Sequence, residues 1–105
     1  MDKNRVLTII SQFQKILELK GIRINKTILF GSCLQGLQKE GSDIDVVVIS
    51  DDFKDKGYWE RIDILSDVIY ELFEPIEAVA MTKEEWEKDG SFVVGYAKNG
   101  EVVYG

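Results

Sequence analysis

The chain has 105 residues, the size of one domain, and we expect a single domain over residues 1–105. Its 19 acidic and 13 basic residues give a formal net charge of −6, which argues against an extended nucleic-acid surface and against an anionic membrane surface. The chain has no histidine and one cysteine, which excludes histidine bases, histidine metal ligands, an internal disulfide and a cysteine-rich zinc site. The N-terminus lacks the pattern of a signal peptide, and no stretch approaches the roughly 20 apolar residues of a membrane span, so we expect a cytoplasmic protein.

The first half of the chain predicts a helix, two strands and a short turn between them. A helix is expected over residues 3–20, with Gly21 as its stop, because apolar residues recur at helical spacing. Strands are expected over 26–30 and 44–49, and a short helical turn over 32–38. The helix face expected in the core comprises Val6, Ile9, Ile10, Phe13, Ile16 and Leu17.

The second half predicts a polar loop over 51–57, a helix over 58–73, and a strand over 76–81. Thr82 and Glu85 form a capping-box pattern that begins a short helix. The buried face of the helix over 58–73 is expected to comprise Trp59, Ile62, Leu65, Ile69, Leu72 and Phe73. We also expect Tyr58 to pack on the core rather than to face a partner.

The tail from Ser91 allows two alternatives. Ser91 can cap a helix that stops at Asn99-Gly100 and is followed by a short strand over 102–104, or Asn99-Gly100 can be the turn of a β-hairpin. With either ending, helices separate a few strands, which predicts an α/β or α+β fold with one small sheet covered by helices.

Two aspartates and a Gly-Ser pair carry the chemical signal. Gly31-Ser32 ends one predicted strand, and ten residues later Asp43 and Asp45 begin the next. Residues at i and i+2 of a strand share a face about 7 Å apart, so both carboxylates point the same way. Paired carboxylates suit Mg²⁺, and a Gly-Ser turn that opens a helix can hold phosphate oxygens. Glu77 is the candidate for a third carboxylate, because it is the charged residue of the strand over 76–81.

The segment GSCLQGLQKEGSDIDVVV resembles the signature of the DNA polymerase beta-like nucleotidyltransferase superfamily. More closely, it is similar to the minimal nucleotidyltransferases, small proteins often encoded beside a HEPN-domain protein as toxin–antitoxin pairs. The resemblance implies a small mixed sheet flanked by helices. It implies transfer of a nucleoside monophosphate from a nucleoside triphosphate, ATP in the first instance, to a hydroxyl acceptor. A tyrosine of a HEPN-domain partner is the acceptor it suggests.

By the same resemblance, Gly31 and Ser32 would hold the triphosphate, and Asp43 and Asp45 would bind two Mg²⁺ ions. Glu77 would bind the catalytic ion and help to activate the acceptor hydroxyl. The small size is compatible with a homodimer.

Three positions depart from the family pattern. Cys33 and Gln35 stand where family members commonly have arginine, and Glu77 stands where aspartate is usual. Lys39, Lys54 and Lys56 are the nearest basic residues in the sequence that could take the place of these arginines. These departures support an alternative function, an inactive or weak antitoxin-like subunit that neutralises a HEPN ribonuclease by forming a complex. The simpler structural roles are a strand start for Asp43, a solvent-facing edge residue for Glu77 and an incidental small residue for Cys33.

Overall fold

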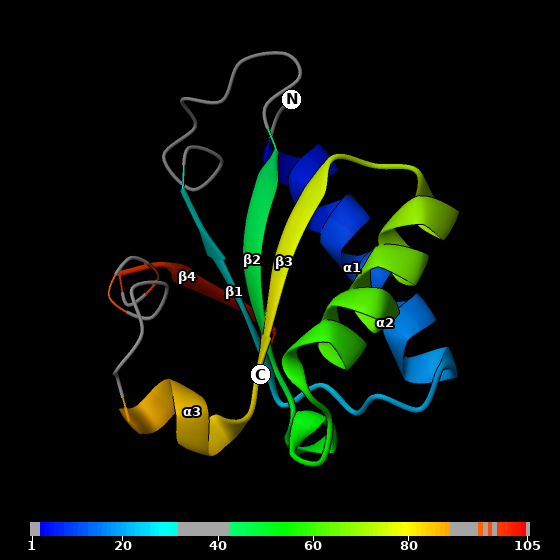
Figure 1. The fold of residues 1–105 in the computed structure, drawn as a ribbon. Helices are drawn as coiled ribbons and strands as arrows, with labels where there is room; N and C mark the ends of the chain where they lie inside the picture. Colours follow the sequence, from blue (N-terminus) through cyan, green and yellow to red (C-terminus); the bar gives the residue numbers. More distant parts are fainter. Residues whose placement is uncertain (1–2, 32–42, 89–94, 96, 98, 105) are drawn as a thin grey trace.

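The computed structural model describes residues 3–31, 43–88, 95, 97 and 99–104. Its four strands form one mixed sheet in the order β3-β2-β1-β4 (Figure 1). The strands are β1 (Lys26–Phe30), β2 (Ile44–Ile49), β3 (Ile76–Met81) and β4 (Glu101–Tyr104). β1 is antiparallel to both β2 and β4, whereas β2 and β3 are parallel. The expected small mixed sheet with helices is confirmed, and β1, β2 and β3 have the predicted bounds.

The helices cover the sheet unequally. α1 (Lys3–Leu19) and α2 (Tyr58–Leu72) pack side by side on one face, and the short α3 (Lys83–Lys88) lies toward the other (Figure 1). No helix among the described residues is long and apolar enough to cross a membrane.

β2 is the central strand of the core and is buried on both faces. Ile44, Val46 and Val48 belong to the cluster formed with α1 and α2. Val47 and Ile49 belong to the cluster on the opposite face, with Met81. Because side chains alternate along a strand, Asp45 lies on the same face as Val47 and Ile49.

α1 ends at Gly21, as predicted. Gly21 has φ of +92°, and its N–H donates to the carbonyl of Glu18 at 3.0 Å. The N–H of Ile22 donates to the carbonyl of Leu17 at 3.1 Å, and both of these side chains are buried. This pair of bonds and the accompanying apolar contact define a Schellman cap.

The segment 51–57 is more ordered than the predicted polar loop. Asp51–Phe53 forms a 3₁₀ helix, η1, and the Ser50 hydroxyl accepts a hydrogen bond from the N–H of Asp52 at 3.1 Å. Phe53 is fully buried against the core. The prediction of a solvated loop is wrong here because burial of one aromatic ring fixes the segment.

α2 has the predicted position, and the predicted core role is confirmed for Leu65 and, in part, for Ile69 and Leu72, but not for the two ends of the predicted face. Leu65 and Val68 are its buried residues, whereas Trp59 is 74% exposed and Phe73 is 88% exposed. At 100° per residue, Trp59 lies on a side of the helix that turns away from Val68. Phe73 directly follows the helix with φ of +57°. The expectation that Tyr58 and Trp59 pack on the core is therefore wrong.

Two expected elements near the C-terminus are present. The N–H of Glu85 donates to the Thr82 hydroxyl at 3.1 Å, and the N–H of Thr82 donates to the Glu85 carboxylate at 2.8 Å, which is the capping box. β4 pairs with β1, and Ala97 has helical backbone, in agreement with the helix–strand ending of the tail. The predicted turn over 32–38 and the Ser91 cap lie outside the described residues.

Candidate active site

Three carboxylates meet at one end of the sheet. Asp45 is the second residue of β2 and Glu77 the second residue of β3, and the parallel register pairs them directly. Directly paired residues of neighbouring strands share a face, so these two side chains lie next to each other. Asp43 precedes β2 by one residue and lies on the same side as Asp45.

The carboxylates perturb one another electrostatically. A protonated Glu77 carboxyl can donate a hydrogen bond to Asp43, and this bond, the charge of Asp43 and the neighbouring Asp45 all raise the pKa of Glu77. Partial burial raises the pKa of Asp45, and the charge of Asp43 adds to this, although the hydrogen bond from Glu77 opposes it. The negative charges of the site therefore repel one another, and a bound cation would relieve this repulsion.

Gly31 forms the floor beneath Asp45. Asp45 pairs with Phe30 across β1 and β2, so Gly31, the residue after Phe30, passes close to the Asp45 carboxylate. A Cβ built on Gly31 would overlap Oδ2 of Asp45 and lie 3.3 Å from its Cγ. Gly31 also has φ of +78°, a conformation that favours glycine. The backbone conformation and the closeness of the Asp45 carboxylate both favour glycine here.

The structure leaves part of the predicted site undescribed. Ser32, Cys33, Gln35 and Lys39 all lie outside the described residues. Lys54 lies close enough to Glu84 of α3 to affect its pKa, and Lys56 lines a hollow beside α2. The described contacts do not join either lysine to the carboxylates.

The donor set suits a hard divalent cation. All three groups are carboxylates, and Mg²⁺ takes one or two protein carboxylates and completes its shell with water and substrate phosphates. Within the described part of the chain, no group of three or more His, Cys, Asp or Glu residues is placed so that it could hold a metal ion. An ion at one or two of these carboxylates would need water or substrate oxygens to complete its ligand shell.

Sequence reasoning missed one part of this geometry. The sequence indicates phosphate binding at Gly31, and the structure adds that Gly31 leaves room for Asp45. The sequence shows a glycine at the end of the strand that precedes the paired aspartates. That this glycine lies against Asp45 follows only from the register of β1 against β2.

The profile of the nucleotidyltransferase domain family matches residues 9–97. This chain belongs to the nucleotidyltransferase domain family. The match confirms the classification as a nucleotidyltransferase and the resemblance at the level of the family. No curated protein matches the sequence.

Solved structures with the nucleotidyltransferase fold share this architecture at low sequence identity. A Sulfolobus solfataricus protein, named as a candidate nucleotidyltransferase, is 16% identical with a TM-score of 0.70, over 95% of this chain and 80% of its own. A toxin–antitoxin crystallised with AMP-PNP is 21% identical with a TM-score of 0.61, over 100% of this chain and 74% of its own. A mutant of the toxin–antitoxin MntA–HpeT is 19% identical with a TM-score of 0.59, over the same shares of the two chains.

Proposed function

We propose that this nucleotidyltransferase moves a nucleoside monophosphate from a nucleoside triphosphate to a hydroxyl group, with a divalent metal ion as cofactor. The observation that carries the proposal is the pairing of Asp45 with Glu77 on neighbouring strands, with Asp43 on the same side. An oxygen-only donor set with open positions suits an ion that is completed by a triphosphate.

The proposed substrate is ATP and the proposed cofactor is Mg²⁺, in the two-ion arrangement of the superfamily that the sequence resembles. A protein with the same fold was crystallised with AMP-PNP, an analogue of ATP, which supports the choice of nucleotide. Asp43 and Asp45 would hold both ions and Glu77 the catalytic one. Bound Mg²⁺ would supply charge stabilisation to the phosphoryl oxygens.

The chain's own groups have separate tasks in the reaction. The acceptor oxygen attacks the α-phosphorus, the bond from that phosphorus to the bridging oxygen breaks, and pyrophosphate leaves with the bond's electron pair. Glu77 would accept the acceptor proton as a carboxylate base. Gly31 keeps Asp45 in place and, with Ser32, would hold triphosphate oxygens.

The proposed acceptor is a tyrosine of a HEPN-domain partner protein. Two structures that share this fold are toxin–antitoxins, which supports a protein partner for this chain. A tyrosine hydroxyl on a protein surface can reach a site at the end of a sheet.

The test measures transfer of label from α-labelled ATP, with Mg²⁺, in a lysate of the native cells. Wild type should label an acceptor, and Asp43→Ala or Asp45→Ala should lower labelling by at least a hundredfold. Asp55→Ala, which removes an exposed aspartate from the loop before α2, is the matched control and should keep full activity. Full activity of Asp43→Ala or Asp45→Ala would contradict the assigned roles.

A second candidate is an antitoxin-like subunit that neutralises a HEPN ribonuclease by binding alone. Cys33 and Gln35, at positions where the family commonly has arginine, favour it, because arginine would neutralise phosphate charge. Co-expression with the partner separates the two functions. The Asp43→Ala/Asp45→Ala double variant still neutralises the partner if binding suffices, and fails if transfer is required.

A further inference from the structure

One side of α2 carries apolar and aromatic side chains that stay wholly or partly exposed. The α2 stripe comprises Trp59, Ile62, Ser66 and Ile69, which recur every three or four residues and so share one side of the helix, and Phe73, which directly follows the helix with φ of +57°. Ile69 also packs partly against the core. Trp59 is 74% exposed and Phe73 is 88% exposed. Tyr70, beside the stripe, is 83% exposed. Such a run of exposed aromatic residues is typical of a protein interface rather than of a solvated helix.

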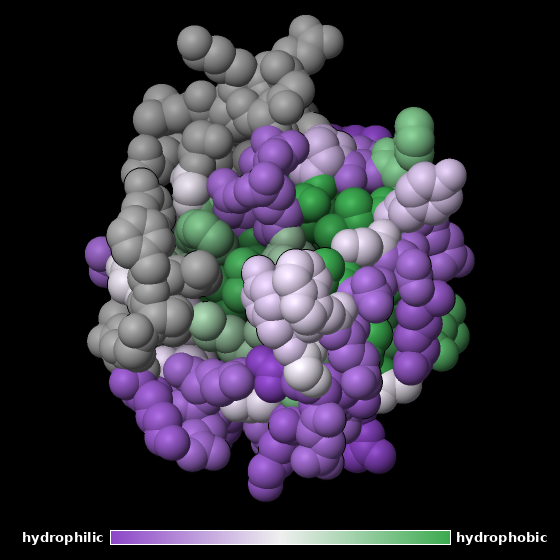
Figure 2. All heavy atoms as spheres, viewed as in Figure 1, coloured by the Kyte–Doolittle hydropathy of each residue, from purple (hydrophilic) through white to green (hydrophobic). Residues whose placement is uncertain are grey.

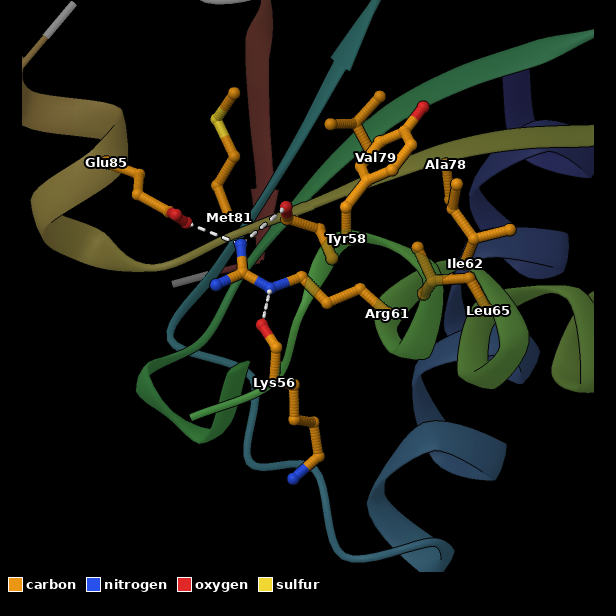
Figure 3. Close-up of a pocket in the computed structure, with 10 residues that line it drawn as sticks. Lys56, Tyr58, Arg61, Ile62, Leu65, Ala78, Val79, Met81 and Glu85 are labelled. Carbon is orange, nitrogen blue, oxygen red and sulfur yellow. Dashed lines mark hydrogen bonds and ion pairs between the residues drawn. The ribbon is translucent and has the colours of Figure 1, made fainter. Parts of the chain in front are cut away.

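The stripe borders a hollow along the outer edge of β3. The hollow has a volume of about 650 Å³, and its lining includes Ile62, Leu65, Ala78 and Val79. Figure 3 shows the Tyr58 side chain extending across it toward β3, and Figure 2 shows hydrophobic atoms within the depression on this face. The small side chain at Ala78 helps to keep the hollow open to solvent.

The outer edge of β3 offers few groups to an added strand. Arg61 Nη1 donates to the carbonyl of Ala80 at 3.4 Å, and the N–H of Ile76 donates to the carbonyl of Glu74 at 2.9 Å. These two bonds occupy the Ala80 carbonyl and the Ile76 N–H, so an added strand would find fewer free partners along β3. A helix lying along the α2 stripe would make more contacts than an added strand. Ser66 allows close approach at the middle of the stripe, and the hollow accepts large side chains.

The charges around the stripe favour a basic occupant. Arg61 and Glu85 neutralise each other at 2.6 Å, which leaves Lys56 as a cation lining the hollow. Asp63 and Asp67 flank the stripe, are exposed, and form no ion pair within the described residues. A second copy of this chain, with its own charge of −6, would bring like charges together.

We propose that the α2 stripe and the adjoining hollow dock an amphipathic helix with a basic flank from a partner protein. Apolar side chains of that helix enter the hollow, and its Lys or Arg residues face Asp63 and Asp67. This surface gives the partner of the proposed function a place to bind, but its test requires no nucleotidyl transfer.

The test uses fluorescent synthetic helices of about 18 residues, or five turns. The first probe has leucines at heptad spacing and lysines on the flanks. The second keeps the leucines and replaces each lysine by glutamate, and the third scrambles the first so that no apolar seam forms. By fluorescence anisotropy, the first probe should bind at least tenfold more tightly than either of the others. Equal binding of the scrambled probe would show only charge attraction and would overturn the proposal.

Variants locate the binding. Trp59→Ser and Tyr70→Ser remove exposed rings and should weaken binding at least tenfold, whereas Leu19→Ser, at an 87% exposed position on α1, should leave it unchanged. Asp63→Asn with Asp67→Asn should weaken binding and reduce its salt dependence. The Asp43→Ala/Asp45→Ala variant should bind the first probe like wild type, so helix binding can be tested independently of nucleotidyl transfer. Equal loss in Leu19→Ser would overturn the proposal. So would self-association of the chain, measured by sedimentation, that Trp59→Ser abolishes.

Discussion

Replacing Gly31 by alanine tests how the site positions Asp45, and Gly21→Ala provides a matched control. Both glycines have positive φ, +78° at Gly31 and +92° at Gly21. A Cβ at Gly21 would meet no heavy atom within 4 Å, whereas a Cβ at Gly31 would overlap the Asp45 carboxylate. The two variants therefore share the backbone strain and differ in the steric contact.

The expected magnitudes follow from that difference. An L side chain at positive φ costs about 1–2 kcal/mol, so Gly21→Ala should lower the free energy of unfolding by that amount. Gly31→Ala adds an overpacking cost of about 1–3 kcal/mol, for a total of about 2–5 kcal/mol. A displacement of about 1 Å in a catalytic group can lower the rate about a hundredfold. Gly31→Ala should therefore lose about a hundredfold in nucleotidyl transfer, and Gly21→Ala less than about threefold.

Urea denaturation followed by circular dichroism measures the stability of both variants, and α-label transfer at a temperature where both are folded measures activity. The reasoning is refuted if the two variants have the same stability and the same activity. It is also refuted if Gly31→Ala keeps wild-type transfer, since Asp45 would then not need its position.

Three further predictions concern stability, each measured by urea denaturation. Arg61→Met should cost about 2–4 kcal/mol, because the 15% exposed Arg61 side chain donates to the carbonyls of Phe53 and Lys56 and to Glu85. Arg5→Met, which removes an ion pair from a 54% exposed side chain, should cost less than about 1 kcal/mol. Similar losses in the two variants would contradict the assigned contacts. Thr82→Ala should cost about 1 kcal/mol through loss of the helix cap, and an unchanged midpoint would argue against that cap. Glu77→Gln should be more stable than wild type at pH 7. A raised pKa means that the stability linked to the Glu77 proton is present at low pH and lost as the pH rises through the folded value. The gain should therefore fade as the pH falls toward 4.5, the ordinary pKa of glutamate, and a gain independent of pH would count against repulsion among the carboxylates.

The strands that carry the site could be predicted because their sequences are short apolar runs with clear ends. β2 has a hydrophobic residue at nearly every position, and Asp45 is the one charged exception, which marks where the strand's end approaches solvent. The pairing of Asp45 with Glu77 depends on the parallel register across α2, and no local pattern specifies that register.

α2 shows why periodicity alone misplaces a buried face. Its apolar residues occupy more than one side, so the spacing of Trp59 and Phe73 fits a helix face as well as that of Leu65 and Val68 does. Packing against α1 and the sheet buries Leu65, which the spacing predicts, and Val68, which it does not. Arg61 gave no sequence signal either, because Glu85, its ion-pair partner, lies 24 residues away.

The central claim is that the paired carboxylates support transfer of the nucleoside monophosphate. The most direct measurement compares ATP labelled on the α-phosphate with ATP labelled on the γ-phosphate, each with Mg²⁺ and the acceptor-containing lysate. We expect the acceptor to gain only the α label, the γ label to leave in pyrophosphate, and neither transfer to occur with Asp43→Ala/Asp45→Ala. Acceptor labelling from γ-labelled ATP, or α labelling that survives in the double variant, would contradict it.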